Sequence, residues 1–457
     1  MRKIFCLLPI VLMATASLAQ SPKSYNFTLE EAISFALDSN YTAINARRDI
    51  AKALKQKWET TATGLPQIDA VVDYQNQLKQ PVIFLPAEIV GGEPGTFTTA
   101  TFGGAQTASA TATLNQLIFD GSYLVGLQAA KAFLDFSENA AEKTNLEVRK
   151  GVINAYGSVL LADELIAIFE RNKATLEKNL FETKKIYENG LTEEENVEQL
   201  EITLLDIETQ LSNAKRSSTI ARQMFNVALG IPTESSVTFT ENLDALAQEN
   251  IKLEFLENSL NIEDNIDYKI AYNLTEQRSL EMKLEKSRAL PRLNAFINYG
   301  TQANSTSFTF LDSDQPWFQQ SILGVSLNVP IFSSGMRSAK TQQAKIALDQ
   351  AETQLEETVQ NVTLELNSAR SNYQFAIEKY ENAKKNLTLA ERIEGKNQVK
   401  FTEGLATSFD LRQAQTQLYT AQQQFIQSML DLINAKANIE TVLNVPKVRI
   451  DSDDIKR

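Results

Sequence analysis

Histidine is absent from this chain, and its single cysteine, Cys6, lies among the first twenty residues. Without histidine the chain lacks the commonest general base and the commonest transition-metal ligand of proteins. Beyond Cys6 there is no thiol for a disulfide framework or for a cysteine nucleophile. No glycine-rich phosphate loop and no paired-carboxylate motif stands out. These absences predict a protein that is not an enzyme and that holds no metal and no cofactor.

Long apolar runs are also scarce. Arg2 and Lys3 precede an apolar stretch from Ile4 to Met13, and residues 17–19 read SLA, which is the pattern of a secretory signal peptide covering residues 1–19. After it, no stretch approaches the ~20 apolar residues of a membrane-spanning helix. The formal charge of −13 argues against nucleic acid as a partner. A secreted chain of this kind is periplasmic, extracellular or a β-barrel.

What the sequence does contain is an internal repeat. Two segments of the first half have similar counterparts in the second half: LNQLIFDG at 114–121 with LNVPIFSSG at 327–335, and LPQIDAVVDY at 65–74 with LPRLNAFINY at 290–299. The glycines and prolines that follow keep one constant spacing, in the pairs Gly121/Gly335, Gly190/Gly404 and Pro232/Pro446. Each half therefore predicts a helix, a strand, a loop, a strand, a very long helix, a turn and a return helix.

The repeat divides the mature chain into two structural repeats and two smaller parts. The first repeat is 20–232, with strands near 65–78 and 105–119, a long helix 121–188, a tip turn 189–192 and a return helix to 230. The second is 263–446, with strands near 290–301 and 318–332, a long helix 335–402, a tip turn 403–407 and a return helix to 444. Residues 233–262 are an expected equatorial connector, and 447–457 an expected C-terminal tail.

The expected strands alternate between apolar and polar residues. Ile68, Val72 and Tyr74 fall on one face of the first strand, and Asp69 and Asp73 on the other. This period of two is typical of a membrane β-strand, with the apolar side toward lipid, so we expect Asp69 and Asp73 to face a barrel lumen. A half-buried sheet in a soluble protein has the same pattern. The stretch 78–105 is rich in glycine, threonine and proline and includes the apolar piece PVIFLPAEIV, and the stretch 301–316 is rich in serine, threonine, asparagine and aspartate. Both suit extracellular loops.

The expected long helices lack proline from Gly121 to Asn189 and from Gly335 to Gly404. Roughly 68 residues at about 1.5 Å each predict a rod near 100 Å, longer than a globular domain requires. The second rod carries a heptad seam that begins at Ala344 and ends at Ala390, with one stutter near Val362. An ordinary coiled coil is the alternative interpretation.

Four strands cannot close a barrel, because known single-chain barrels begin at about eight strands. An open sheet in lipid would leave backbone groups unpaired, at a cost of several kcal/mol each. We therefore expect identical copies to complete the sheet, and three copies supply twelve strands.

With this order of elements present twice, the chain resembles the TolC family of outer-membrane efflux ducts. The motifs LNQLIFDG, LNVPIFSSG, NGLTEEENVEQLE and EGLATSFDLRQAQTQLYTAQ carry the resemblance, which spans essentially the whole mature chain. It implies an α+β membrane protein of the Gram-negative outer membrane. The implied homotrimer has a 12-stranded barrel with four strands per chain, a coiled-coil periplasmic barrel and a small mixed α/β equatorial region. It also implies a periplasmic adaptor and an inner-membrane pump as partners.

The resemblance further implies that the two turns form the periplasmic tip. The expected adaptor contacts are Gly190, Leu191 and Thr192 in one turn and Gly404, Leu405, Ala406 and Thr407 in the other. A plain turn between two helices is the alternative for both segments.

The residues that form the tunnel constriction in the family have only partial matches in this sequence. Phe401 matches its aromatic position and Asp410 its first acid, whereas Ala406 replaces the basic residue and Gln413 the second acid. Tyr187 is the aromatic counterpart in the first half. A ring of three Asp410 side chains could bind cations. A solvated helix aspartate is the competing interpretation.

The expected function is a passive exit duct that passes small amphiphiles or drugs. The duct of a type I protein secretion system is the near alternative, and the duct sequence does not distinguish the two. A periplasmic adaptor and a coiled-coil scaffold are alternatives of a different class.

Overall fold

The computed structural model describes residues 24–101, 103–257 and 261–445, which form two compact units. The helical unit, as we call it, comprises residues 24–45, 144–257 and 364–445. The sheet unit comprises residues 46–143 without residue 102, together with 261–363. The expected signal peptide at 1–19 and the expected tail at 447–457 lie outside the described residues.

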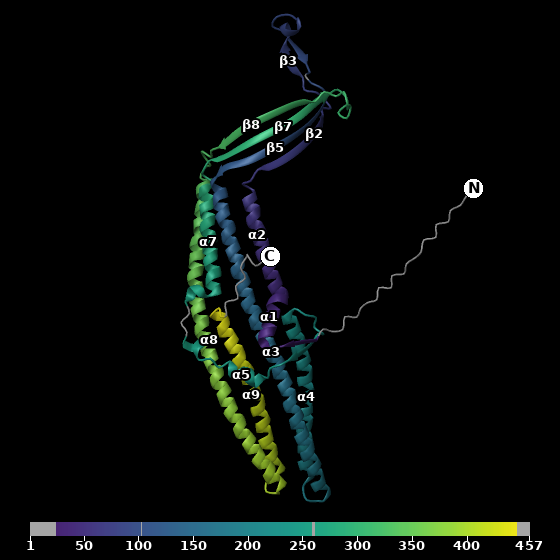
Figure 1. The fold of residues 1–457 in the computed structure, drawn as a ribbon, viewed down its shortest axis with the longest axis vertical. Coiled ribbons are helices and arrows are strands. Elements are labelled where there is room, and N and C mark those ends of the chain that lie inside the picture. The colour runs from purple at the N-terminus through teal and green to yellow at the C-terminus, as the bar shows by residue number, and fades with distance from the viewer. Residues whose placement is uncertain (1–23, 102, 258–260, 446–457) are drawn as a thin grey trace, which may run out of the picture. The chain divides into compact units, whose positions relative to one another are not determined.

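One antiparallel sheet forms the centre of the sheet unit, with its strands in the order β2-β5-β7-β8 (Figure 1). The strands are β2 (Gln67–Asn76), β5 (Gln106–Asp120), β7 (Arg292–Ser305) and β8 (Phe318–Asn328). The two repeats meet where β5 pairs with β7. Within the described chain, β2 and β8 each pair on one side only, so the sheet has two open edges.

The register of this sheet separates an apolar face from a polar face. Across the four strands, Ile68, Leu114, Ile297 and Leu323 stand in one row. The neighbouring row begins on the opposite face with Asp69, Thr113 and Asn298. Because neighbouring strands keep side chains in register on one face, the alternation seen in each strand is shared by β2, β5 and β7, whereas β8 places Ile322 opposite Asn298 in the polar row.

Two strand ends differ from the expected ones. β8 ends at Asn328 instead of near 332, because Pro330 has no N–H to donate to a ladder. β7 continues past 301 to Ser305, because residues 302–305 pair with residues 106–109 of β5.

The stretch 78–105 contains a second hairpin where the sequence indicated only a surface loop. β3 (Ile83–Pro86) pairs antiparallel with β4 (Phe97–Ala100), and the 3-10 turn η1 (Ala87–Val90) lies between them. Phe84 and Phe97 are both 72% exposed on this hairpin. Figure 1 shows it leaving the end of the four-stranded sheet.

The long helices follow the second strand of each repeat. They are α3 (Gly121–Glu188) and α8 (Met336–Thr402). The Asp120 carboxylate starts α3 by accepting hydrogen bonds from the N–H groups of Ser122 (2.7 Å) and Tyr123 (3.4 Å), donors that a helix start leaves unpaired. The return helices are α4 (Glu194–Leu229) and α9 (Ser408–Val442), and the shorter helices that precede the strands are α1 (Leu29–Ser39), α2 (Tyr41–Ala62) and α7 (Ile266–Ser287).

Aromatic side chains form the centre of the helical unit's core. Tyr156 of α3, Phe225 of α4 and Tyr373 of α8 are fully buried, and the rings of Tyr156 and Phe225 meet edge to face at 5.8 Å. The Tyr373 hydroxyl donates to the carbonyl oxygen of Asn250 (2.6 Å), which satisfies its polar end.

The expected connector region is a mixed structure that packs on this core. β6 (Ser236–Phe239) pairs in parallel with β1 (Ser24–Phe27), which joins the connector to the start of the described chain. The remaining short elements are α5 (Leu243–Glu249), α6 (Glu254–Glu257) and η2 (Ile262–Asp264).

The heptad seam of α8 is a buried stripe. Val362, Ala369, Tyr373, Ala376 and Ala390 are buried, and the remaining seam positions from Ala344 to Ala390 are buried or half-buried. The seam residues therefore pack against the chain's other helices, as the coiled-coil pattern predicted.

One described helix, α3, includes a segment that is long and apolar enough to cross a membrane by length and composition alone. The expectation that no such segment follows the signal peptide is wrong at this helix. Half of the segment is buried, and α3 places Val152, Tyr156 and Val159 in the core. Core packing therefore accounts for its apolar character.

Candidate functional site at the two helix turns

The turn between α8 and α9 is built around Gly404. Its φ of +73° lies in the left-handed region that glycine adopts without a Cβ clash. The N–H of Gly404 donates to the carbonyl of Phe401 (3.0 Å), and the N–H of Leu405 donates to the carbonyl of Lys400 (2.7 Å). This pair of bonds is the Schellman arrangement that closes a helix C-terminus.

The turn between α3 and α4 repeats that geometry. Gly190 has a φ of +74°, its N–H donates to Tyr187 (2.8 Å), and the N–H of Leu191 donates to Ile186 (3.1 Å). The two turns lie together, because the Ser408 hydroxyl at the start of α9 donates to the amide oxygen of Asn196 on α4. Both halves of the repeat therefore contribute to one site.

Two leucines protrude from this site. Leu191 is 78% exposed and Leu405 is 79% exposed, so each turn presents one apolar side chain to its surroundings. Thr192 and Ala406 beside them are half-buried, and the Thr192 hydroxyl accepts a hydrogen bond from the Asn196 amide (2.9 Å). Each leucine therefore stands on a turn whose backbone is fixed by hydrogen bonds.

Asp410 is held by the helix start that it caps. Its carboxylate accepts from the Thr407 N–H (3.0 Å) and the Thr407 hydroxyl (2.7 Å), while the Thr407 hydroxyl accepts from the Asp410 N–H (3.2 Å). This is a complete capping box. The hydrogen bonds from Thr407, with a smaller effect of nearby Lys400, lower the pKa of Asp410. The group is exposed and charged at neutral pH.

The other expected constriction residues occupy different positions at the turns. Gln413 follows Asp410 by three residues on α9 and is exposed, so the two share one helix face. Phe401 is half-buried in the last turn of α8, and Tyr187 is 40% exposed in the last turn of α3. Asp410 and Gln413 are thus adjacent to one another, whereas each aromatic is tied to its own glycine turn.

A buried polar cluster further up the α8–α9 hairpin was not expected from the sequence. Burial raises the pKa of Glu394, and the nearby Gln415 amide partly offsets this effect. Tyr419 is buried nearby, and burial followed by the Glu394 charge raises the pKa of its hydroxyl. The four-residue spacing of Gln415 and Tyr419 predicts that both lie on one face of α9. No sequence signal indicates that Glu394 of α8 lies beside them.

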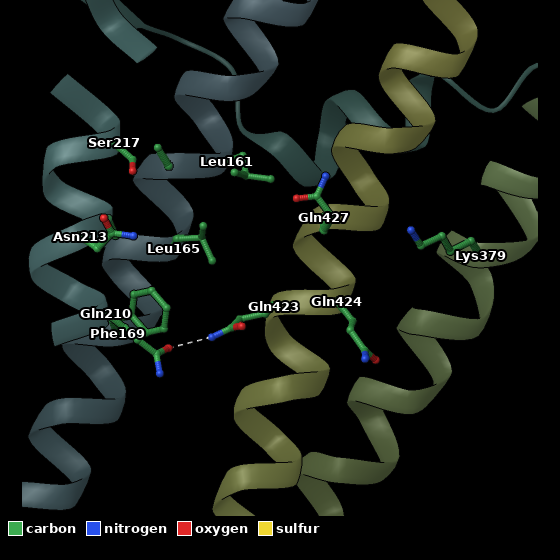
Figure 2. Close-up of a pocket in the computed structure, with 12 residues that line it drawn as sticks. Leu161, Leu165, Phe169, Gln210, Asn213, Ser217, Lys379, Gln423, Gln424 and Gln427 are labelled. Atoms are coloured by element: carbon green, nitrogen blue, oxygen red, sulfur yellow. Dashed lines mark hydrogen bonds between the residues drawn. The ribbon is translucent and has the colours of Figure 1, made fainter. Parts of the chain in front are cut away.

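Further along the same helices from the turns, α3, α4, α8 and α9 line a groove of about 680 Å³. Figure 2 shows Leu161, Leu165 and Phe169 of α3 on one side and Gln423, Gln424 and Gln427 of α9 on the other. The dashed line in Figure 2 joins the amides of Gln423 and Gln210 at 2.9 Å. Amide pairs also join α3 to its neighbours, from Asn172 to Gln422 (3.0 Å) and from Asn179 to Gln398 (3.1 Å).

The expected lumen residues stand on the polar face of the sheet. Asp69 pairs across the ladder with Thr113, and Asp73 with Ser109. The positions next along these rows are Asn298 and Gln302 of β7. The polar face continues over three strands, while the face with Ile68 remains apolar.

The described residues at the turns offer carboxylates, amides and exposed leucines. Such groups can contact a protein partner or line a passage. The chemistry of the site is therefore binding and electrostatic.

Comparison with known proteins gives a consistent result over both repeats. The profile of the family described as "Outer membrane efflux protein" matches residues 32–230 and 273–445. The toluene efflux pump outer membrane protein TtgC of Pseudomonas putida is 22% identical, over 69% of this chain and 64% of its own length. The outer membrane protein TolC of Vibrio cholerae is 25% identical, over 71% of this chain and 74% of its own. The alkaline protease secretion protein AprF of Pseudomonas aeruginosa is 22% identical, over 72% and 68%.

Solved structures share the fold over nearly the whole chain. The CmeC outer membrane channel of Campylobacter jejuni superposes with a TM-score of 0.74 at 15% identity, covering 93% of this chain and 88% of that one. CusC superposes with a TM-score of 0.71 at 16% identity, covering 91% of each chain.

Proposed function

This chain belongs to the outer membrane efflux protein family, and we propose that three copies of it form a passive exit duct of a tripartite export system. It is an outer-membrane protein of the TolC type that extends into the periplasm. In the proposed assembly, a periplasmic adaptor and an inner-membrane pump deliver the cargo, and the duct supplies the path through the outer membrane. No bond is made or broken in the cargo.

The observation that carries the proposal is the open four-stranded sheet. Its edges, β2 and β8, would leave backbone N–H and C=O groups unpaired in hydrocarbon, at a cost of several kcal/mol for each group. Pairing β8 of one copy with β2 of the next removes both edges, and three copies give a closed barrel of twelve strands. The apolar face with Ile68 and Leu323 then meets lipid, and Asp69 and Asp73 line the lumen.

The names of the relatives indicate two candidate classes of cargo. The name of TtgC describes a toluene efflux pump, which favours small amphiphiles or drugs as cargo. The name of AprF describes protease secretion, which keeps a type I protein secretion duct as the second candidate. The match covers under two thirds of TtgC, so this cargo is carried over as a proposal.

The turns are the proposed contact with the adaptor. Leu191 and Leu405 are equivalent, exposed and apolar, and both stand on Schellman turns with a fixed backbone. Such side chains suit pockets on a partner, because burying a leucine on binding contributes about 1.5–3 kcal/mol. The glycines Gly190 and Gly404 and the neighbouring Thr192, Ala406 and Thr407 set the direction of the two leucines.

We also propose that three Asp410 carboxylates surround the entrance of the duct, with Gln413 one turn further and Phe401 and Tyr187 at the ends of the long helices. Three like charges attract cations and raise one another's pKa. The capping box supports a second role for Asp410, because the same carboxylate fixes the start of α9.

Single-channel recording in planar bilayers tests the duct and its entrance. The purified protein is expected to conduct, and divalent cations are expected to block it from the turn side. Asp410→Asn keeps a capping acceptor and removes the charge, so it is expected to weaken the block by divalent cations. Glu403→Gln, at an exposed acid of the same turn, is the control. Equal block in both variants would leave Asp410 as a capping residue only, and no conductance at all would contradict the duct.

A further inference from the structure

A pocket of about 400 Å³ opens in the helical unit, among four parts of the chain that are far apart in the sequence. Its lining comes from α1, α3, α9 and the connector at 233–262, which contains α5. The helices contribute residues three or four positions apart, such as Glu30 and Ile33 of α1 or Arg149 and Ile153 of α3, which lie on one face of a helix. Only the folded chain brings these residues together.

The least exposed charges of the pocket, which we call its base, are Arg149, Lys436 and Glu440. Arg149 and Glu440 are joined at 2.6 Å, and Lys436 lies 3.2 Å from the same carboxylate. The Arg149, Glu440 and Lys436 side chains are 13%, 8% and 14% exposed. One carboxylate thus serves two cations, so the base has one positive charge in excess. Within the described chain Arg149 uses one of its five N–H donors for a hydrogen bond, so an anion in the pocket can accept the others.

A further carboxylate that lines the pocket, Glu241, has donors of its own. It accepts hydrogen bonds from the N–H of Leu29 (2.8 Å) and from the hydroxyl of Tyr156 (3.1 Å). Leu29 is the first residue of α1, and the unpaired N–H groups of a helix start favour a negative charge beside them. These donors stabilise the Glu241 carboxylate where it stands, so the base keeps its positive excess.

The exposed charges of the pocket, which we call its rim, are mainly negative. They are Glu30 of α1, Glu249 of α5 and Lys252, which follows α5 in the connector. Within residues 24–101, 103–257 and 261–445, no hydrogen bond or ion pair engages the carboxylate of Glu30 or of Glu249. Two acids against one cation leave the rim with a negative excess, opposite in sign to that of the base.

The rest of the pocket wall is mainly apolar. Ile33 of α1, Ile153 of α3, Leu246 of α5 and Ile433 of α9 all line it with buried side chains. Such a wall accepts an aliphatic group, because it presents no further polar atom that a ligand would have to satisfy. A volume of about 400 Å³ is at the small end of ligand pockets, which suits a molecule of the size of a dipeptide.

We propose that this pocket binds a short zwitterionic peptide with an aliphatic side chain, its carboxylate at the base and its ammonium at the rim. The carboxylate accepts hydrogen bonds from Arg149 and Lys436. The ammonium donates to Glu30 and Glu249. A simple anion would be repelled by the rim and a simple cation by the base, so only a molecule with both charges is complementary to the whole pocket. Every residue of the site belongs to one chain, so the binding does not depend on the proposed trimeric duct.

Isothermal titration calorimetry on the full-length protein in detergent tests the site with three matched probes. Alanyl-leucine carries both charges, N-acetyl-alanyl-leucine lacks the ammonium, and alanyl-leucinamide lacks the carboxylate. We expect alanyl-leucine to bind, and each modified probe to bind about tenfold or more weaker, because each loses a charge-assisted hydrogen bond. No binding of alanyl-leucine at millimolar concentration would overturn the proposal. Equal binding of the N-acetyl probe would overturn it too, and would assign the pocket to the carboxyl terminus of a protein.

A rim variant tests where the ammonium lies. Glu249→Gln removes one of the two rim acids and should weaken alanyl-leucine binding about three- to tenfold, while N-acetyl-alanyl-leucine binds as before or better. Glu234→Gln, at an exposed acid of the same connector outside the pocket, is the matched control and should leave all three affinities unchanged. Equal affinities for alanyl-leucine in the two variants would contradict the proposed position of the ammonium.

Discussion

At the scale of single residues, the two turns depend on glycines whose conformation other residues rarely adopt. Gly190 and Gly404 occupy equivalent positions in the two repeats. Their positions predicted both turns, because helices often end at a glycine in the left-handed conformation. The role of Asp410 was harder to predict. The sequence T-S-F-D after Gly404 fits a capping box as well as a constriction acid, and only the structure places the carboxylate on Thr407.

Substituting alanine for Gly404 should destabilise the protein by about 1–2 kcal/mol, because a Cβ is strained at a φ of +73° even where nothing else crowds it. Gly395, in the middle of α8, is the matched control. It has no positive φ and no neighbour near an added Cβ, so Gly395→Ala should be neutral or stabilising by up to about 1 kcal/mol.

Thermal unfolding followed by the helical circular dichroism signal measures both variants. The midpoint is expected to fall for Gly404→Ala and to rise or stay unchanged for Gly395→Ala. Equal shifts in the same direction would show that the Gly404 conformation is not what stabilises the turn.

At the scale of elements, periodicity predicted most of the strands and long helices. Period two located β2, β5, β7 and β8, and the absence of proline located α3 and α8. The β3–β4 hairpin was not predicted, because its four-residue strands are too short to show a period of two among the surrounding glycine, proline and threonine residues. The β1–β6 pair was not predicted either, because parallel pairing between strands more than two hundred residues apart in the sequence has no local sequence signal.

A second stability prediction concerns the ion pair that joins α3 to α9. Arg149 and Glu440 form an ion pair of 2.6 Å in which both side chains are nearly buried, and Lys436 lies 3.2 Å from the same carboxylate. Glu440→Ala should cost about 3–5 kcal/mol, because it leaves buried positive charge without its partner.

Glu188→Ala is the control for Glu440→Ala, because it removes the exposed pair with Lys185 and should cost under about 1 kcal/mol. Chemical denaturation in detergent compares the two variants. Similar losses in both would contradict a structural role for the buried pair.

At the scale of the whole molecule, the repeat predicted the architecture better than any single motif did. Two turns, two long helices and two strand pairs follow from the repeated order of elements alone. The chain's own strands cannot, however, reveal how many copies close the sheet. That number follows from the cost of open edges in lipid and from the packing between copies, and neither is a property of one chain.

Closure of the sheet by three identical copies is the central claim, and the protein mass in detergent tests it most directly. Light scattering coupled to size-exclusion chromatography, corrected for bound detergent, should give three times the mass of one mature chain for protein extracted from the outer membrane. A folded monomer that stays soluble without detergent would contradict the account.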